Sequence, residues 1–161
     1  MTKTALSAFH PVVREWFETS FPGPTEPQSL AWPAIAAGES TLLLAPTGTG
    51  KTLAAFLFCI DRLMFHGEAG GCRILYVSPL KALAVDIERN LRAPLSGISR
   101  IAKARGTPHR APTVAIRTGD TKAGERARFQ RSPSDILITT PESLYLLLTS
   151  RSREALGASR P

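Results

Sequence analysis

The sequence has few of the residues that build disulfide frameworks or metal centres. Its two cysteines, Cys59 and Cys72, fall in separate segments, so we expect reduced thiols in a cytoplasmic protein and no disulfide framework. Its three histidines, His10, His66 and His109, lack metal-ligand spacing. A metal centre built from protein side chains alone is therefore not expected.

Long apolar runs are also missing. The longest, Leu53–Ile60, is far shorter than the roughly 20 residues that cross a bilayer. Residues Met1–Phe9 contain no apolar core that would suit a secretory signal. These two absences predict a globular chain of one domain's length that has no membrane partner.

Acidic residues are outnumbered by basic ones, 13 to 20, which gives a net charge of +7. Eleven of the basic residues fall between Arg89 and Arg131, a region that contains two acids, Asp120 and Glu125, with Asp86 and Glu88 just before it. This imbalance favours a face that meets phosphates. An arginine-rich solvated surface is the alternative, and charge alone does not separate the two.

The most informative stretch present is Ala45–Thr52. It follows the apolar residues Leu42–Leu44 and precedes Leu53–Phe58, an order that predicts a strand, a tight loop and a helix. Because Gly48 and Gly50 have no side chains, backbone N–H groups can close around an anionic oxygen there. The stretch therefore predicts a phosphate-binding loop.

Two side chains at the end of this loop complete its chemistry. Lys51 would place an ammonium on the β and γ phosphates of a nucleotide, and Thr52 would offer a hydroxyl to Mg²⁺. Ala45 stands where the strict pattern has glycine, and a small residue still fits there. A turn without a ligand is the alternative, which the complete A-x-x-x-x-G-K-T pattern disfavours.

Short β-rich runs alternate with helical patterns along the rest of the chain, which predicts an α/β fold with a three-layer parallel sheet. An apolar stripe at helical spacing marks the first helix, and Thr25 and Gln28 fit a capping box before the second, which Gly38 closes. The expected strands are 41–45, 73–77, 113–117 and 135–139, and the expected helices are 5–20, 25–38, 51–65, 79–91, 95–103, 122–131 and 141–148.

Three expected helices start directly after strands, at Thr47–Lys51, Ser78-Pro79 and Thr140-Pro141. In a parallel sheet these starts would open along one edge, where their free N–H groups attract phosphate. Ser or Thr followed by Pro is also common at the first residues of helices that bind no ligand. Lys81, the turn Thr118–Asp120 and the basic middle of the chain favour a role in binding a polymer of phosphates.

Five segments together resemble the first RecA-like domain of a superfamily 2 helicase of the DEAD/DEAH type, most closely the large helicase-related (Lhr) group of ATP-dependent DNA helicases. The resemblance runs from about His10 to Leu148 and implies a P-loop NTPase fold, here incomplete. The segments that carry it are Pro24–Gln28, Ala45–Thr52, Ser78–Asp86, Arg117–Thr121 and Thr139–Leu144.

The resemblance implies roles for individual residues. Gln28 would read the adenine edge of ATP, supported by Thr25, and Lys51 and Thr52 would be the catalytic and Mg²⁺-binding residues. The loop residues Pro46, Thr47, Gly48, Thr49 and Gly50 would hold the phosphates. The backbone of DNA, single-stranded or duplex, or of RNA, would be held by Ser78, Pro79, Leu80, Lys81, Thr118, Gly119, Asp120, Thr140, Pro141 and Glu142, as in a DNA repair helicase.

Part of the expected machinery is missing from the sequence. No apolar run ends in Asp-Glu, the pair that would hold Mg²⁺ and polarise water, and no second RecA-like domain follows. We expect a truncated product with a helical lead-in at 1–40, a partial ATP-binding domain at 41–150 and a non-family or disordered tail at 151–161. Alone it would bind nucleotide weakly and hydrolyse ATP far below helicase rates, with an exposed apolar sheet edge, unless a partner chain supplies the other half.

Two other functions remain open. A nucleic-acid-binding or regulatory module would keep the fold without ATPase activity, and its affinity for DNA would not depend on ATP or Lys51. Another P-loop enzyme, such as a small-molecule kinase, is disfavoured because the middle of the chain is basic and no lid or acceptor-site acid follows the loop.

Overall fold

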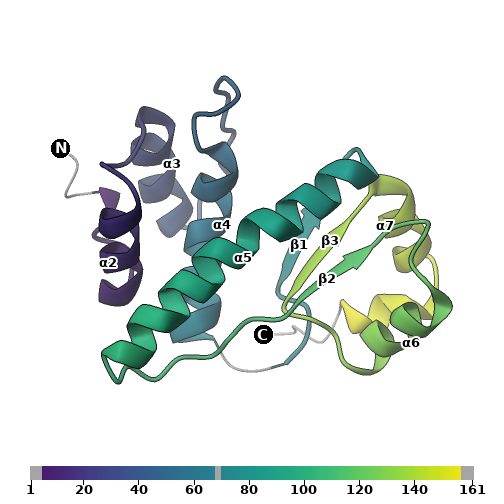
Figure 1. The fold of residues 1–161 in the computed structure, drawn as a ribbon. Helices are drawn as coiled ribbons and strands as arrows, with labels where there is room; N and C mark the ends of the chain where they lie inside the picture. The colour runs from purple at the N-terminus through teal and green to yellow at the C-terminus, as the bar shows by residue number, and fades with distance from the viewer. Residues whose placement is uncertain (1–4, 68–69, 157–161) are drawn as a thin grey trace. The chain divides into compact units, whose positions relative to one another are not determined.

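The computed structural model describes residues 5–67 and 70–156, and Figure 1 shows the order of its elements along the chain. The chain divides into two compact units, one formed by Met1–Gly67 with Ala93–Ala111 and the other by Glu68–Arg92 with Pro112–Pro161. We call the first the helical unit and the second the sheet unit.

The helical unit contains α2 (Pro11–Ser20), α3 (Glu26–Ala36) and α4 (Lys51–Asp61), which continues as a π-helical turn, η1 (Arg62–His66). It also includes the second half of α5 (Lys81–Ala104). The apolar stripe predicted for the first helix is confirmed by the burial of its members, Phe9, Val12, Val13, Trp16 and Phe17.

Trp32 of α3 is the centre of the helical unit's core. Its side chain is fully buried, and its indole Nε1–H donates to the carbonyl oxygen of Ala54 in α4 at 3.0 Å. The rings of Phe9 and Phe17 meet it edge-on, with centroids at 5.0 and 5.4 Å. One aromatic side chain thereby joins α3 to α4 and to the segment around α2.

The sheet unit is built on three parallel strands, β1 (Ile74–Val77), β2 (Val114–Arg117) and β3 (Ile136–Thr139), in the order β1-β3-β2. The central strand is buried along its whole length, whereas every residue of β2 is only half-buried. Parallel strands buried on both faces read as continuous apolar runs, as β3 does. The predicted parallel α/β fold is confirmed.

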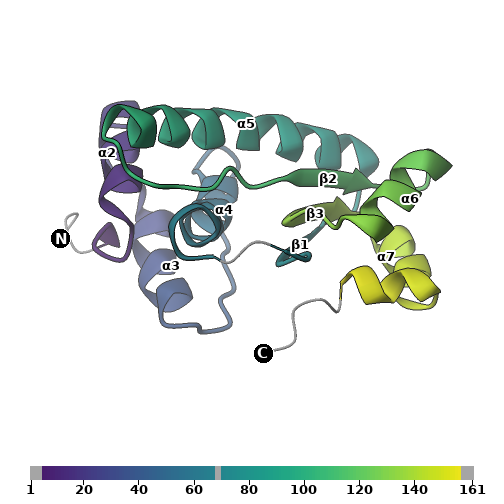
Figure 2. The same ribbon diagram turned by 90° about the horizontal axis from the view of Figure 1, so that it is seen from below.

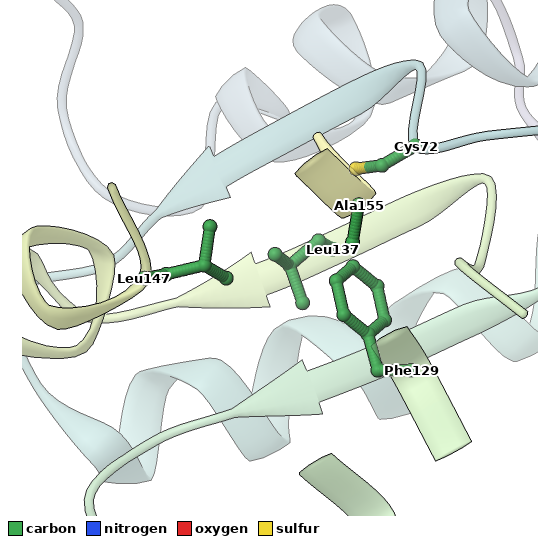
Figure 3. Packing of buried hydrophobic residues seen from close by; sticks show 5 residues of the cluster. All are labelled: Cys72, Phe129, Leu137, Leu147 and Ala155. Carbon is green, nitrogen blue, oxygen red and sulfur yellow. The ribbon is translucent and has the colours of Figure 1, made fainter. Parts of the chain in front are cut away.

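Helices cover both faces of this sheet. On one face, α6 (Ala123–Arg131), α7 (Pro141–Leu148) and the 3₁₀ turn η2 (Arg151–Ala155) contribute side chains to a cluster around Leu137 (Figure 3). The first half of α5 lies over the other face (Figures 1 and 2). The cluster consists of Cys72, Phe129, Leu137, Leu147 and Ala155.

The predicted strand at 41–45 is wrong, because in the described part of the chain those residues join no sheet. A strand forms only where a neighbour supplies backbone donors and acceptors. Leu42 and Leu44 are 84% and 83% exposed, although their sequence is that of a buried strand. These exposed leucines belong to no sheet, so they are not the exposed apolar sheet edge that the sequence predicted.

The two helices expected at 79–91 and 95–103 are one helix, α5, which begins at Lys81 rather than Pro79. Pro94 removes only one N–H from its hydrogen-bond ladder. Leu91, Ile98 and Ala102 are buried on both sides of that proline, so packing outweighs the lost bond. The interruption expected between residues 91 and 95 is therefore absent, and the helix continues through Pro94.

The tail predicted at 151–161 is structured in its first part. Residues 151–155 form η2, and Ala155 is buried in the cluster around Leu137. Residues 157–161 lie outside the described part of the chain. No helix within residues 5–67 and 70–156 is long and apolar enough to cross a membrane.

A substitution at Gly97 tests the packing of the helical unit. A Cβ there would lie 2.3 Å from the indole Nε1 of buried Trp16, so we expect Gly97→Ala to lower the free energy of unfolding by about 1–3 kcal/mol. Thermal and urea unfolding followed by circular dichroism measure this. Gly124→Ala in α6, where a Cβ meets nothing within 4 Å, is the matched control, and an equal loss in both variants would contradict the packing described here.

Candidate functional site

The loop before α4 has the backbone shape that its glycines predict. Gly48 and Gly50 both have φ of 80°, in the left-handed region that other residues rarely adopt. Gly50 is the N-cap of α4 and leaves the first-turn N–H groups without a side-chain cap. Uncapped N–H groups and the positive end of a helix together suit an anion.

Lys51 folds back over this loop. Its ammonium donates to the carbonyl oxygens of Ala45 and Pro46, and the hydroxyl of Thr49 donates to the Pro46 oxygen at 2.8 Å. The lysine is half-exposed, and Thr47 and Thr52 are exposed on the loop and on the first turn of α4. The ammonium therefore stays at the loop, where an arriving phosphate would exchange for the carbonyl oxygens.

Thr25 and Gln28 form the predicted capping box at the start of α3. Gln28 is 3% exposed, and its Oε1 accepts from the backbone N–H of Thr25 at 3.0 Å. Its Nε2 donates to the carbonyl oxygen of Gly50 at 3.2 Å, and the hydroxyl of Thr25 donates to the Thr49 oxygen at 2.9 Å. The capping residues are thus tied to the phosphate-binding loop, a connection that sequence spacing did not reveal.

Gly50 has a second reason to be glycine. A Cβ at this position would lie 2.4 Å from Nε2 of Gln28, whereas a Cβ at Gly48 would meet nothing within 4 Å. Gly48 is therefore required for its φ alone, and Gly50 is required for both its φ and the close approach of the glutamine.

Asp61, at the far end of α4, is not the missing second carboxylate. Its side chain is fully buried, and Oδ1 accepts from the backbone N–H of His10 at 2.7 Å. Burial raises the pKa of its carboxyl above the usual range. At 1.5 Å of rise per residue it lies about 15 Å from Lys51 along the helix, too far to act with it at one site. Its bond to His10 instead ties α4 to the start of α2.

In the sheet unit, the predicted nucleic-acid segments follow the aligned ends of the strands. Val77 and Arg117 both pair with Thr139, so the three strands end in register. The backbone N–H of Ser78 donates to the Thr139 oxygen at 2.8 Å. The ammonium of Lys81 lies 2.6 Å from a carboxylate oxygen of Asp120, which joins two of the three segments directly.

The turn that holds Gly119 is braced from α6. Arg126 donates through Nε to the carbonyl oxygen of Thr121 and through Nη2 to that of Gly119, both at 2.8 Å. The backbone N–H of Thr118 donates to the hydroxyl of Thr121 at 2.8 Å. Sequence reasoning noted the polar helix at 122–131 but missed Arg126, because only the fold brings that side chain back to the turn.

The third segment departs from simple helix capping. Thr140 is the N-cap of α7, but its buried hydroxyl bonds the Ser143 hydroxyl at 3.2 Å and no helix N–H. Pro141 and Glu142 are exposed beside it, as are Pro79 and Leu80 in the first segment. The start of α4 belongs to the helical unit. The edge of the sheet unit therefore consists of the three segments at 78–81, 118–120 and 140–142.

Within residues 5–67 and 70–156, no three His, Cys, Asp or Glu side chains gather in a way that would hold a metal ion. Mg²⁺ at Thr52 would therefore depend on oxygens of a bound nucleotide for most of its ligands.

Comparison with known proteins gives the family. Residues 25–159 match the model of the DEAD/DEAH box helicases, a match that enters the predicted tail. The Lhr helicase/probable uracil glycosylase of Mycolicibacterium smegmatis is 54% identical over 157 residues, which cover 96% of this chain and 10% of that protein. The ATP-dependent helicase Lhr-Core of Methanothermobacter thermautotrophicus is 45% identical over 159 residues, which cover 96% of this chain and 18% of that protein.

A solved structure of the Mycobacterium smegmatis helicase Lhr bound to ssDNA and AMP-PNP agrees, with a TM-score of 0.91 and 54% identity over 97% of this chain and 20% of that one. The chain thus spans between a tenth and a fifth of the length of these relatives. These matches confirm the resemblance inferred from the motifs: the chain belongs to the DEAD/DEAH box helicase family and is similar within it to the Lhr helicases.

Proposed function

We propose that this chain is the N-terminal part of an Lhr-type ATP-dependent DNA helicase, with ATP bound at the loop 46–52 and a nucleic-acid backbone bound at the strand ends of the sheet unit. The observation that carries the proposal is the uncapped start of α4 with the Lys51 ammonium held beside it. The Mycobacterium smegmatis helicase Lhr was solved with ssDNA and AMP-PNP bound, which supports the proposal of a nucleotide and a nucleic acid as ligands.

In this proposal the loop amides and Lys51 neutralise the phosphates, and Thr52 offers its hydroxyl to Mg²⁺. Lys51 and Thr52 would be the catalytic residues of the complete enzyme, and Gln28, held by Thr25, would read the base. The nucleic-acid role is proposed for the residues at 78–81, 118–120 and 140–142. A cytoplasmic location also belongs to the proposal, supported by Cys59 and Cys72, neither of which forms a disulfide within the described residues.

A second candidate is a nucleic-acid-binding or regulatory module that keeps this fold without ATPase activity. The observation that favours it is that, within residues 5–67 and 70–156, no three His, Cys, Asp or Glu side chains gather in a way that would hold a metal ion. Nucleotide binding separates the two functions, because the module would bind DNA with the same affinity whether or not ATP or Lys51 is present.

Removal of the Lys51 ammonium tests the nucleotide site. We expect Lys51→Ala to weaken binding of a fluorescent ATP analogue by tenfold or more, about 1.4 kcal/mol, because a charge-assisted contact to the phosphates is lost. Lys103→Ala, an exposed lysine of the same unit, is the charge-matched control and should bind as the wild type does. Equal affinity in the Lys51→Ala variant and the wild type would refute the proposed site.

The two loop glycines give a paired test of the geometry. Gly50→Ala should weaken ATP binding more than Gly48→Ala, because only the former also displaces the Gln28 side chain. The left-handed backbone costs alanine about 1–2 kcal/mol at either position, and the difference between the variants reports the glutamine contact. Titration with the same analogue measures both, and identical losses would contradict the proposed coupling.

The nucleic-acid edge is tested at Lys81, whose side chain is 54% exposed. We expect Lys81→Ala to weaken binding of oligo(dT) severalfold and to reduce the slope of log Kd against log salt by about 0.7 to 1, because one phosphate contact is lost. Fluorescence anisotropy over a salt series measures both quantities. An unchanged slope would exclude Lys81 as a phosphate contact, and Lys103→Ala again serves as the control.

A further inference from the structure

A pocket of about 490 Å³ lies between β2 and α6, within the sheet unit. One wall is the whole of β2 from Val114 to Arg117, and the other is formed by α6 and the residues after it, through Ser134. Because it runs the length of a strand, its shape suits an extended chain.

The strand that lines this pocket has an open edge. The backbone N–H of Ile136 donates to the Thr113 oxygen, so Thr113, Ala115 and Arg117 turn their backbone groups toward β3. Backbone direction alternates along a strand, so Val114 and Ile116 turn theirs away from β3, toward the open edge of the sheet. Among the described residues, the hydroxyl of Thr121 donates a long hydrogen bond of 3.5 Å to the Ile116 oxygen.

The pocket is also strongly basic. Arg117, Arg126 and Arg128 line it, against a single acid, Glu125. Arg126 is already bonded to the turn at 119–121, whereas neither Arg117 nor Arg128 forms an ion pair with any described residue. The buried Nη1 of Arg117 has no hydrogen-bond partner.

Burial, and then the charge of Arg126, lower the pKa of the Arg117 guanidinium. A buried donor left without an acceptor destabilises the site, and a carboxylate would supply that acceptor.

We propose that this pocket binds an acidic polypeptide segment in extended conformation, which adds to the sheet as a fourth strand beside β2. A peptide offers both donors and acceptors at the strand repeat of about 6.6 Å for alternate residues, as the Val114 and Ile116 groups require. A DNA backbone offers acceptors alone, which leaves the strand carbonyl oxygens unmatched. Glutamates at alternate positions would all face the arginines.

The residues that line this pocket include none of the loop residues 46–52 and none of the edge residues at 78–81, 118–120 and 140–142, although Arg126 lines the pocket and also braces the turn that holds Gly119. The proposal is therefore tested with a probe and variants of its own. The probe is a fluorescein-labelled peptide of alternating glutamate and valine, seven residues long. A version methylated on alternate backbone nitrogens keeps the charge but removes the donors, and a lysine–valine version reverses the charge.

We expect saturable binding of the glutamate peptide to the full chain, a loss of tenfold or more on backbone methylation, and no binding of the lysine peptide. Arg117→Gln and Arg128→Gln should each weaken binding at least fivefold. Arg131→Gln, on the same helix but outside the pocket, is the charge-matched control and should bind as the wild type does. In amide NMR spectra, Val114 and Ile116 should shift on titration.

Three results would overturn the proposal: no binding of the glutamate peptide, binding unchanged by backbone methylation, or equal weakening by Arg131→Gln and Arg128→Gln. Displacement of the bound peptide by oligo(dT), with the same loss in the Lys81→Ala variant, would also overturn it, because the peptide would then occupy the nucleic-acid edge.

Discussion

The parallel register of β3 with both neighbours is the constraint on which the sheet unit depends. Pairing of Val77 and Arg117 with the same residue, Thr139, makes three chain segments leave the sheet at one level. A shift of one residue in either pairing would turn the buried side chains of a strand to the opposite face. The order of the motifs at the strand ends is therefore fixed by the core, before any ligand is considered.

Much of this fold could be predicted from residue patterns, because its strands are apolar and its first helix has apolar residues at helical spacing. The capping box at Thr25 and Gln28 and the φ of the loop glycines needed only local information. The strand at 41–45 could not be excluded, since its sequence has every local property of a buried strand and only the absence of a neighbour in the described chain decides otherwise. The break expected between residues 91 and 95 was wrong for the converse reason, because residues buried on both sides of Pro94 keep α5 continuous against the local preference of proline.

Contacts between side chains and backbone groups of other elements account for what sequence reasoning missed at the candidate site. Arg126 braces a turn that lies five to seven residues earlier, and Gln28 reaches Gly50 across 22 residues. In both cases the side chain bonds a backbone oxygen, which any residue can provide, so no particular residue type marks the partner. The motif residues themselves carry charges or unusual φ angles, which the sequence does mark.

The double engagement of Gln28 has a consequence for nucleotide selectivity. A base that recruits this carboxamide has to replace hydrogen bonds that the free protein already makes. The preference for one base over another is then a difference in free energy between two states in which the carboxamide is hydrogen-bonded. Exchanging one set of hydrogen bonds for another contributes little net free energy. Most of the affinity for a nucleotide would therefore come from its phosphates. A base that bonds Gln28 would instead change the contact between the glutamine and the Gly50 oxygen of the loop.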